Sequence, residues 1–214
     1  MRDFPVFTTE YGVSSLILKE IPYRKQAFIC IRDVQPDGFA GHLAECVAFC
    51  KMAGADHIFA AGHPQLEQYP LYTSVVKMRG QPKIDVADLA QLFPVTEQTV
   101  TQWRQIHNEA MSRVDNAGTL EGRDEKRILE SGGAYFVHEK GQLLGIGWMV
   151  DHVLLAIASV VPGAGTRVMQ TLMSLYPDEP ITLEVASTNK RAISLYERLG
   201  FLSVEEISCW HRVG

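Results

Sequence analysis

Apolar residues recur along the first part of the chain with the periods of strands and helices. Two short apolar runs, residues 13–21 and 26–34, are separated by the turn-prone sequence PYRK and predict an antiparallel hairpin. In residues 39–52 the apolar positions are spaced by three and four, and Gly54 follows them. This spacing predicts a helix with one buried face that ends just before the glycine.

Two further apolar runs follow that helix and complete a first module. Residues 57–61 predict a strand parallel to the second hairpin strand, because a helix separates the two, and residues 72–78 predict one more strand. The sequence RGQP, which ends at residue 82, then interrupts the pattern. We therefore expect an N-terminal α/β module over residues 1–82 and a second domain over residues 83–214.

The second domain begins with helices and continues with strands. Residues 99–114 carry one apolar stripe and predict a helix, and a shorter helix is expected around residues 124–129. Three apolar runs then predict an antiparallel meander with the tight pair Asp151-His152 as its second turn. These runs are residues 134–138, 143–150 and 153–161, and a helix over residues 166–176 is expected after them.

The last part of the chain again alternates strand and helix. Residues 181–186 alternate apolar and polar side chains, as a strand with one buried face does, and residues 189–199 have a helical stripe that Gly200 ends. Residues 201–207 and 209–213 are expected to form a closing antiparallel pair. The predicted fold class is α/β (α+β), a mixed sheet flanked by helices.

Composition and charge narrow the class of protein. Of 214 residues 46% are apolar and 21% charged, as in ordinary globular proteins, and no apolar run is long enough to cross a bilayer. The N-terminus lacks the apolar centre of a secretory signal, so we expect a cytoplasmic protein without membrane contact. The net charge is −5, and all the excess acid lies in residues 83–214. This balance disfavours nucleic-acid binding and is compatible with a cationic small substrate.

Cysteine and histidine spacing argues against disulfides and a metal site. The four cysteines, Cys30, Cys46, Cys50 and Cys209, show no CxxC spacing, so reduced buried thiols are expected. His42, Cys46 and Cys50 share one helix face, but eight helical residues rise about 12 Å, whereas zinc ligands lie about 2 Å from the metal. His42 and Cys50 therefore cannot share an ion, and we predict no metal.

Residues 162–166 join a predicted strand to a predicted helix through the sequence PGAGT. The first N–H groups of a helix have no acceptor within it, and glycines let a phosphate approach the backbone closely. The loop lacks the GK[ST] ending of a nucleotide P-loop and the third glycine of the dinucleotide fingerprint. Either it is only a tight turn, or it holds the diphosphate of another kind of coenzyme.

Two segments carry a resemblance to a known family. The sequences VVPGAGTRVMQTLM and LEVASTNKRAISLYERLGF resemble the coenzyme-binding half of the GNAT N-acetyltransferase superfamily. Eight residues of the second segment match the family in order and spacing: Val185, Asn189, Ala192, Ile193, Leu195, Tyr196, Gly200 and Phe201. The resemblance extends, less specifically, over residues 92–214. It implies a GNAT-like mixed sheet, acetyl-CoA as the cofactor, and acetyl transfer to a primary amine by direct attack on the thioester.

The resemblance also implies roles for single residues. Backbone N–H groups would hold the coenzyme A diphosphate, namely those of Gly163, Ala164, Gly165 and Thr166. Backbone groups of Ala158 and Val160 would pair with the pantetheine arm, which lies between two strands that splay apart. Asn189 would contact the arm or its carrier strand. Tyr196 would be the general acid that protonates the departing thiolate, although an aromatic residue on a buried stripe is equally consistent with a core position.

The loop departs from the family in one respect. Pro162 directly precedes Gly163, so the loop is short, and Val160 stands where the family has Arg or Gln. Fewer amides and one cation less would weaken diphosphate binding. Arg167, on the first turn of the helix, would partly replace the missing charge.

A group that accepts the proton of the amine is also required. Glu184 is the first candidate, since it lies on the strand beside the splay and opposite the apolar face; a solvated strand carboxylate explains it equally well. The acceptor is a small-molecule amine or a protein amino group, and the acidic excess favours a polyamine, an aminoglycoside or a lysine-like compound. The alternative function is a catalytically inactive GNAT-fold coenzyme sensor or interaction module.

The first module faintly echoes the second in its order of strand, helix and strand. It lacks the Asn and Tyr of the second segment, and Asp37 in its loop would repel a diphosphate. We interpret it as non-catalytic and as a degenerate GNAT-like half, which completes either a wall of the acceptor cleft or an oligomer interface. A monomer or a homodimer is expected.

Overall fold

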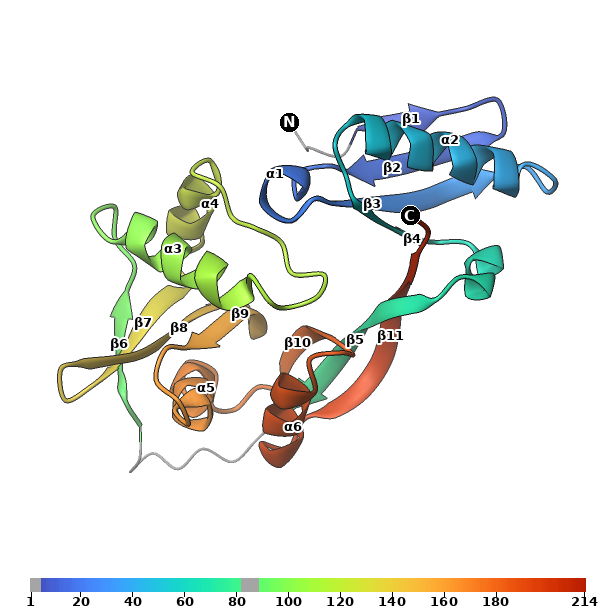
Figure 1. Ribbon diagram of the computed structural model, residues 1–214. Coiled ribbons are helices and arrows are strands. Elements are labelled where there is room, and N and C mark those ends of the chain that lie inside the picture. Colours follow the sequence, from blue (N-terminus) through green and yellow to red (C-terminus); the bar gives the residue numbers. More distant parts are fainter. Residues whose placement is uncertain (1–4, 82–88) are drawn as a thin grey trace. The chain divides into compact units, whose positions relative to one another are not determined.

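The computed structural model describes residues 5–81 and 89–214, which form two compact units (Figure 1). Unit 1 contains residues 5–74 and Ile207–Gly214, and unit 2 contains the described part of Val75–Glu206. The domain boundary predicted at residue 82 lies outside the described residues. Strands β5 (Leu71–Gly80) and β11 (Leu202–Arg212) each contribute to both units.

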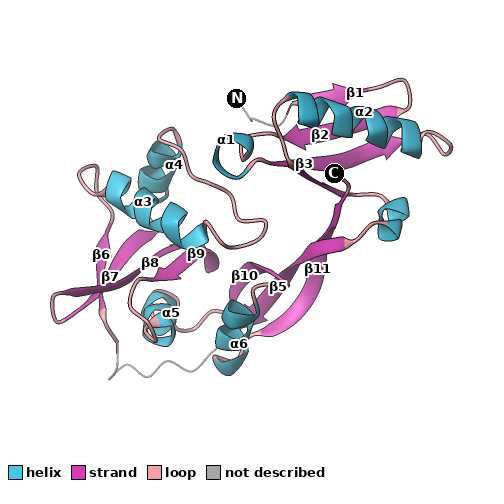
Figure 2. Ribbon diagram, viewed as in Figure 1, coloured by secondary structure: helices cyan, strands magenta, loops and turns pink. Residues whose placement is uncertain are grey.

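Unit 1 is a sheet with strand order β1-β2-β3-β4-β11 and helix α2 (Figure 2). Its elements are β1 Val6–Thr8, β2 Gly12–Ile17, α1 Ile21–Arg24, β3 Gln26–Val34, α2 Phe39–Met52, β4 His57–Ala61 and the 3-10 helix η1 Pro64–Gln68. β2 pairs antiparallel with β3, and β4 pairs parallel to β3, which confirms the predicted hairpin and the predicted parallel strand. The short strand β1, which pairs with β2, was not expected.

The buried face of α2 carries both of its cysteines and a histidine. Cys46, Cys50 and His42 are each 0% exposed, and no disulfide forms among the cysteines, all of which lie in described residues. The His42 ring lies between two hydroxyls: its Nδ1 is 2.8 Å from Thr9 Oγ1 and its Nε2 is 2.7 Å from Ser14 Oγ. Both ring nitrogens thus have partners, which allows a histidine to be buried without an unsatisfied polar group.

Unit 2 has the strand order β6-β7-β8-β9-β10-β5, with the first part of β11 beside β5. Its strands are β6 Gln91–Pro94, β7 Ala134–Glu139, β8 Gln142–Val150, β9 Val153–Ser159 and β10 Ile181–Ala186. Its helices are α3 Val100–Met111, α4 Asp124–Ser131, α5 Gly165–Met173 and α6 Lys190–Arg198. The predicted meander is confirmed. Asp151 and His152, with φ of 47° and 54°, form the tight turn between β8 and β9 in the left-handed region.

Helices cover both faces of β7, β8 and β9. On one face, α3 and α4 pack through Trp103 and Ile128 against Trp148 and its neighbours. On the other face, α5 and α6 pack against a second apolar core that includes β10. Gly147 of β8 permits the close approach of α5, because a Cβ there would lie 2.2 Å from Leu172 Cδ1. The fold is the mixed α/β arrangement predicted from the sequence.

The predicted closing pair of strands is wrong. Residues 202–212 form the single strand β11, which pairs antiparallel with β4 at its C-terminal end. The two predicted strands were separated only by Ser208, and a tight hairpin needs a loop of about two residues. In addition, no helix within residues 5–81 and 89–214 has the length and apolar character that a membrane span requires.

Candidate functional site

β9 and β10 are parallel neighbours that separate along their length. Within the described part of the chain they pair at two positions only, Thr182 with Val153 and Leu183 with Leu154. β9 remains paired with β8 as far as Ser159, and β10 remains paired with β5 as far as Ala186. Each strand is therefore held by its outer neighbour, and a gap opens between their C-terminal halves in the middle of the sheet.

The loop after β9 brings the N-terminus of α5 to the end of this gap. A Cβ on Gly165 would lie 3.4 Å from Leu195 of α6 and 3.8 Å from Ser159 Oγ, so the first residue of α5 lies between β9 and α6. Gly163 has φ of 85°, and a Cβ there would meet no heavy atom within 4 Å. A left-handed conformation favours glycine, and the space beside it is open.

The first N–H groups of α5 have no acceptor of their own. No side chain caps the helix. The N–H of Ala164 donates to Val161 O at 3.2 Å, whereas those of Gly165 and Thr166 bond to no residue that the structure describes. Unsatisfied N–H groups and the positive end of the helix dipole make this N-terminus a favourable place for an anion.

The backbone of β9 presents alternate residues to β8 and to the gap. Val160 N–H donates to Leu144 O at 2.9 Å, and Val161 N–H donates to the same oxygen at 3.4 Å. The carbonyl oxygen of Ala158 also faces β8, since it would lie 2.3 Å from a Cβ on Gly145. Because successive residues of a strand direct their polar groups to opposite sides, those of Ser159 and Ile157 face the gap.

Asn189 lies at the start of α6, where its side chain caps the helix. Its Oδ1 accepts a hydrogen bond from Ala192 N at 3.2 Å. This contact accounts for an Asn before a helix without any ligand. The residue follows β10 by three positions, so the cap also fixes the turn on one side of the gap.

Tyr196 is a core residue of unit 2. Its side chain is 6% exposed, and its ring packs 5.9 Å from that of Phe201. Burial raises the pKa of Tyr196 to about 12. The Tyr196 hydroxyl forms no hydrogen bond to a described residue. It is nevertheless not fully buried, because among the described residues Gln26 Oε1 is the one fully buried side-chain nitrogen or oxygen that has no hydrogen-bond partner.

Arg167 and Glu184 lie on different sides of the predicted site. Arg167 forms an ion pair with Glu139 of β7, so its charge is already compensated. Glu184 is exposed on β10, on the face opposite buried Leu183, and its cross-strand neighbour on β5 is Lys77. Glu184 and Lys77 share one face of the sheet but form no ion pair within 4 Å.

The corresponding strands of unit 1 do not separate. β3 and β4 pair at five successive positions, from Gln26 with His57 to Cys30 with Ala61. The backbone continues in contact beyond them, because a Cβ on Gly62 would lie 2.4 Å from Ile31 O. Tyr11 packs on the start of α2, where a Cβ on Gly38 would meet it at 2.8 Å. Unit 1 therefore repeats the order of strand, helix and parallel strand without the gap.

The structure thus brings together the loop glycines, Thr166, Asn189 and the C-terminal halves of β9 and β10. Reasoning from the sequence missed the role of Leu144, whose carbonyl binds two N–H groups of the loop. Two successive N–H groups that share one carbonyl oxygen have no signature in the residues Val160-Val161-Pro162. Over the described residues, no group of three or more His, Cys, Asp or Glu side chains is arranged to hold a metal ion.

Comparison with known proteins gives one family. Residues 93–201 match the model of the Acetyltransferase (GNAT) family. No curated protein matches the sequence.

Solved structures with a similar fold include three that span nearly the whole chain. A GCN5-related N-acetyltransferase from Sphaerobacter thermophilus has a TM-score of 0.58 and 12% identity, covering 94% of this chain and 76% of that one. A functionally unknown conserved protein from Staphylococcus epidermidis has a TM-score of 0.57 and 10% identity, covering 99% and 94%. A tandem GNAT protein from the clavulanic acid biosynthesis pathway has a TM-score of 0.52 and 12% identity, covering 94% and 78%. At these identities the likeness concerns the fold alone.

Proposed function

Because the chain belongs to the GNAT acetyltransferase family, we propose that it is an N-acetyltransferase that transfers an acetyl group from acetyl-CoA to a primary amine. The observation that carries the proposal is the gap between β9 and β10, which ends at the uncapped N-terminus of α5. Each strand has an unpaired edge along the gap, and an extended chain with amide groups can bind to such an edge through backbone hydrogen bonds.

The residues around the gap fit coenzyme A. The N–H groups of Gly165 and Thr166, with the open space beside Gly163, support binding of a diphosphate. For the pantetheine arm, the directions of the backbone groups favour pairing with Ser159 and Ile157. The expected residues Ala158 and Val160 are each displaced by one position and direct their polar groups to β8. Bound acetyl-CoA supplies an acetyl group activated as a thioester.

Two side chains are proposed to move protons. Glu184 accepts a proton from the ammonium group of the acceptor at one of its carboxylate oxygens, because only the neutral amine is a nucleophile. The Tyr196 hydroxyl holds its proton at neutral pH, as its pKa of about 12 requires, and donates it to the leaving group. The same burial makes Tyr196 a weaker acid than an exposed tyrosine, so proton transfer depends on how basic the leaving thiolate is.

A panel of primary amines assayed for release of free thiol from acetyl-CoA tests this proposal. We expect at least one amine to be acetylated by the full chain. Tyr196→Phe should lower kcat by about 10²-fold or more with little change in coenzyme affinity, since general acid catalysis contributes about 10² to 10⁴. Tyr23→Phe, at an exposed tyrosine of unit 1, is the matched control and should leave turnover unchanged.

A coenzyme-binding module without catalysis is the second candidate. The ion pair of Arg167 with Glu139 favours it, because that pairing compensates the one cation on the first turn of α5. Thermal unfolding of the full chain with acetyl-CoA and with desulfo-coenzyme A separates the outcomes. Stabilisation by both without turnover of any amine supports the module, and stabilisation by neither at millimolar concentration contradicts both functions.

A further inference from the structure

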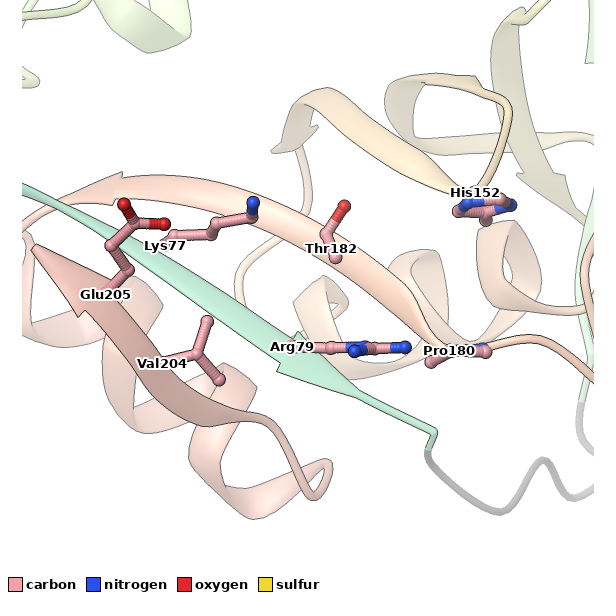
Figure 3. Close-up of a pocket in the computed structure, with 7 residues that line it drawn as sticks. All are labelled: Lys77, Arg79, His152, Pro180, Thr182, Val204 and Glu205. Atoms are coloured by element: carbon pink, nitrogen blue, oxygen red, sulfur yellow. The ribbon is translucent and has the colours of Figure 1, made fainter. Parts of the chain in front are cut away.

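A pocket of about 280 Å³ lies on the face of unit 2 that α5 and α6 do not cover (Figure 3). It is lined by Lys77, Arg79, His152, Pro180, Thr182, Val204 and Glu205. Lys77 and Arg79 come from β5, Thr182 from β10, and Val204 and Glu205 from β11, while His152 lies in the turn before β9. None of these residues belongs to the gap described above.

The register of β5 and β10 places the two cations on one face. Arg79 pairs with Thr182 and Lys77 with Glu184 across the strands, while between them Met78 pairs with Leu183 in the core on the opposite face. In Figure 3, the Lys77 ammonium group and the Thr182 hydroxyl point to the same side, and the Arg79 guanidinium is directed toward Pro180. The floor of the pocket therefore carries two positive charges and a hydroxyl.

Acidic side chains lie near these two cations but beyond ion-pairing distance. Lys77 and Arg79 form no ion pair with any described residue, although Glu205 lines the same pocket. His152 is different, because its Nδ1 lies 2.9 Å from Glu179 Oε2. Counted with histidine neutral, the lining residues carry two cations and one carboxylate, an excess of one positive charge in a chain of net charge −5. Glu179 beside His152 and Glu184 beside Lys77 do not line the pocket.

We propose that this pocket binds a carboxylate or phosphate group. A guanidinium binds either group through two parallel hydrogen bonds, and the Lys77 ammonium and the Thr182 hydroxyl supply further donors. Glu184 lies next to Lys77 on the same face, two residues from Thr182. The bound carboxylate or phosphate therefore belongs to the acceptor, whose amine is directed toward Glu184. This assignment to the acceptor rests on the proposed function, whereas the anion site does not. It replaces the cationic acceptor favoured by the overall charge with an amine that also carries an acidic group.

Titration of the full chain with inorganic phosphate, followed by amide chemical shifts at constant ionic strength, tests the anion site. We expect shifts at residues 77–79 and 182, and affinity at least about tenfold weaker in the double variant Lys77→Gln/Arg79→Gln. Glu205→Gln should instead tighten phosphate binding, because it removes the opposing carboxylate. The control Lys51→Gln/Arg113→Gln makes the same charge change at two exposed positions outside the pocket and should bind phosphate as the parent chain does. Absence of saturable shifts at these positions, or equal weakening in both double variants, overturns the proposal.

Acetyl transfer to matched amines distinguishes the two sources of the anionic group. With an amino acid and its carboxamide as acceptors, Lys77→Gln/Arg79→Gln should raise KM for the former by about tenfold more than for the latter, and phosphate should compete with the former. Phosphate binding without this difference assigns the pocket to a free anion and overturns the acceptor assignment. Turnover of amines without phosphate binding overturns the anion site and leaves the proposed function standing. Phosphate binding without turnover of any amine overturns the proposed function and leaves the anion site standing.

Discussion

Substitution of Gly147 by alanine tests how closely α5 must pack to present its N-terminus. A Cβ at this position would lie 2.2, 2.6 and 2.9 Å from Cδ1, Cδ2 and Cγ of Leu172, a residue that is 0% exposed. All three contacts are shorter than 3.0 Å, so the leucine cannot accommodate the methyl group by moving one terminal atom, and α5 must move away from β8. Overpacking of this kind costs about 1 to 3 kcal/mol of unfolding free energy.

Urea unfolding followed by circular dichroism measures this cost, and a second substitution assigns it to Leu172. Leu172→Ala alone should cost about 2 to 5 kcal/mol, because it leaves a cavity. In Gly147→Ala/Leu172→Ala the added methyl group enters that cavity, so the total loss should fall short of the sum by about 1 to 3 kcal/mol. Gly122→Ala is the control, since a Cβ there meets nothing within 4 Å. Additive losses, or a Gly147→Ala chain as stable as the control, would refute this packing argument.

Three further predictions concern single side chains. Burial lowers the pKa of His42 below its ordinary 6.5. The contribution of His42 to stability is therefore complete above pH 6.5 and is lost as pH falls through its pKa in the folded state. The slope of unfolding free energy against pH between pH 7 and 5 should be smaller in His42→Gln, and an equal slope contradicts this. Burial raises the pKa of the Cys50 thiol to about 12, so Cys46 and Cys50 should react with a thiol reagent only after unfolding, and rapid labelling of the native chain would disprove their burial. Asn189→Ala should lose about 1 kcal/mol while Asn189→Asp retains the cap, and equal losses would exclude the capping role.

Much of the fold follows from periodicity along the chain. Helix α2 and strand β10 have the predicted bounds, because each carries one continuous apolar face and ends at a residue that breaks the pattern. The strand β1 was missed because its three residues are too short to show alternation. β11 was divided in two because both of its faces are exposed over residues 202–206, which removes the alternation that marks a single strand.

Parts of the candidate site depend on contacts that a local pattern does not encode. The direction of the β9 backbone is set by its pairing with β8, whose register shifts between Trp148 and Met149. Arg167 stands on the first turn of α5 as expected, but its partner Glu139 is 28 residues away in sequence. The pocket at Lys77 and Arg79 requires β5 to lie between β10 and β11, and β5 precedes both by more than 100 residues.

Backbone amide chemical shifts of the full chain during titration with coenzyme A show where the coenzyme binds. We expect saturable shifts at residues 157–166 and 185–189, on both sides of the gap and at the start of α5. We expect none at residues 26–31 and 57–62, where the strands of unit 1 stay paired. Shifts confined to unit 1, or no shifts at residues 157–166 when coenzyme A is saturating, would contradict the assignment of the gap as the coenzyme site.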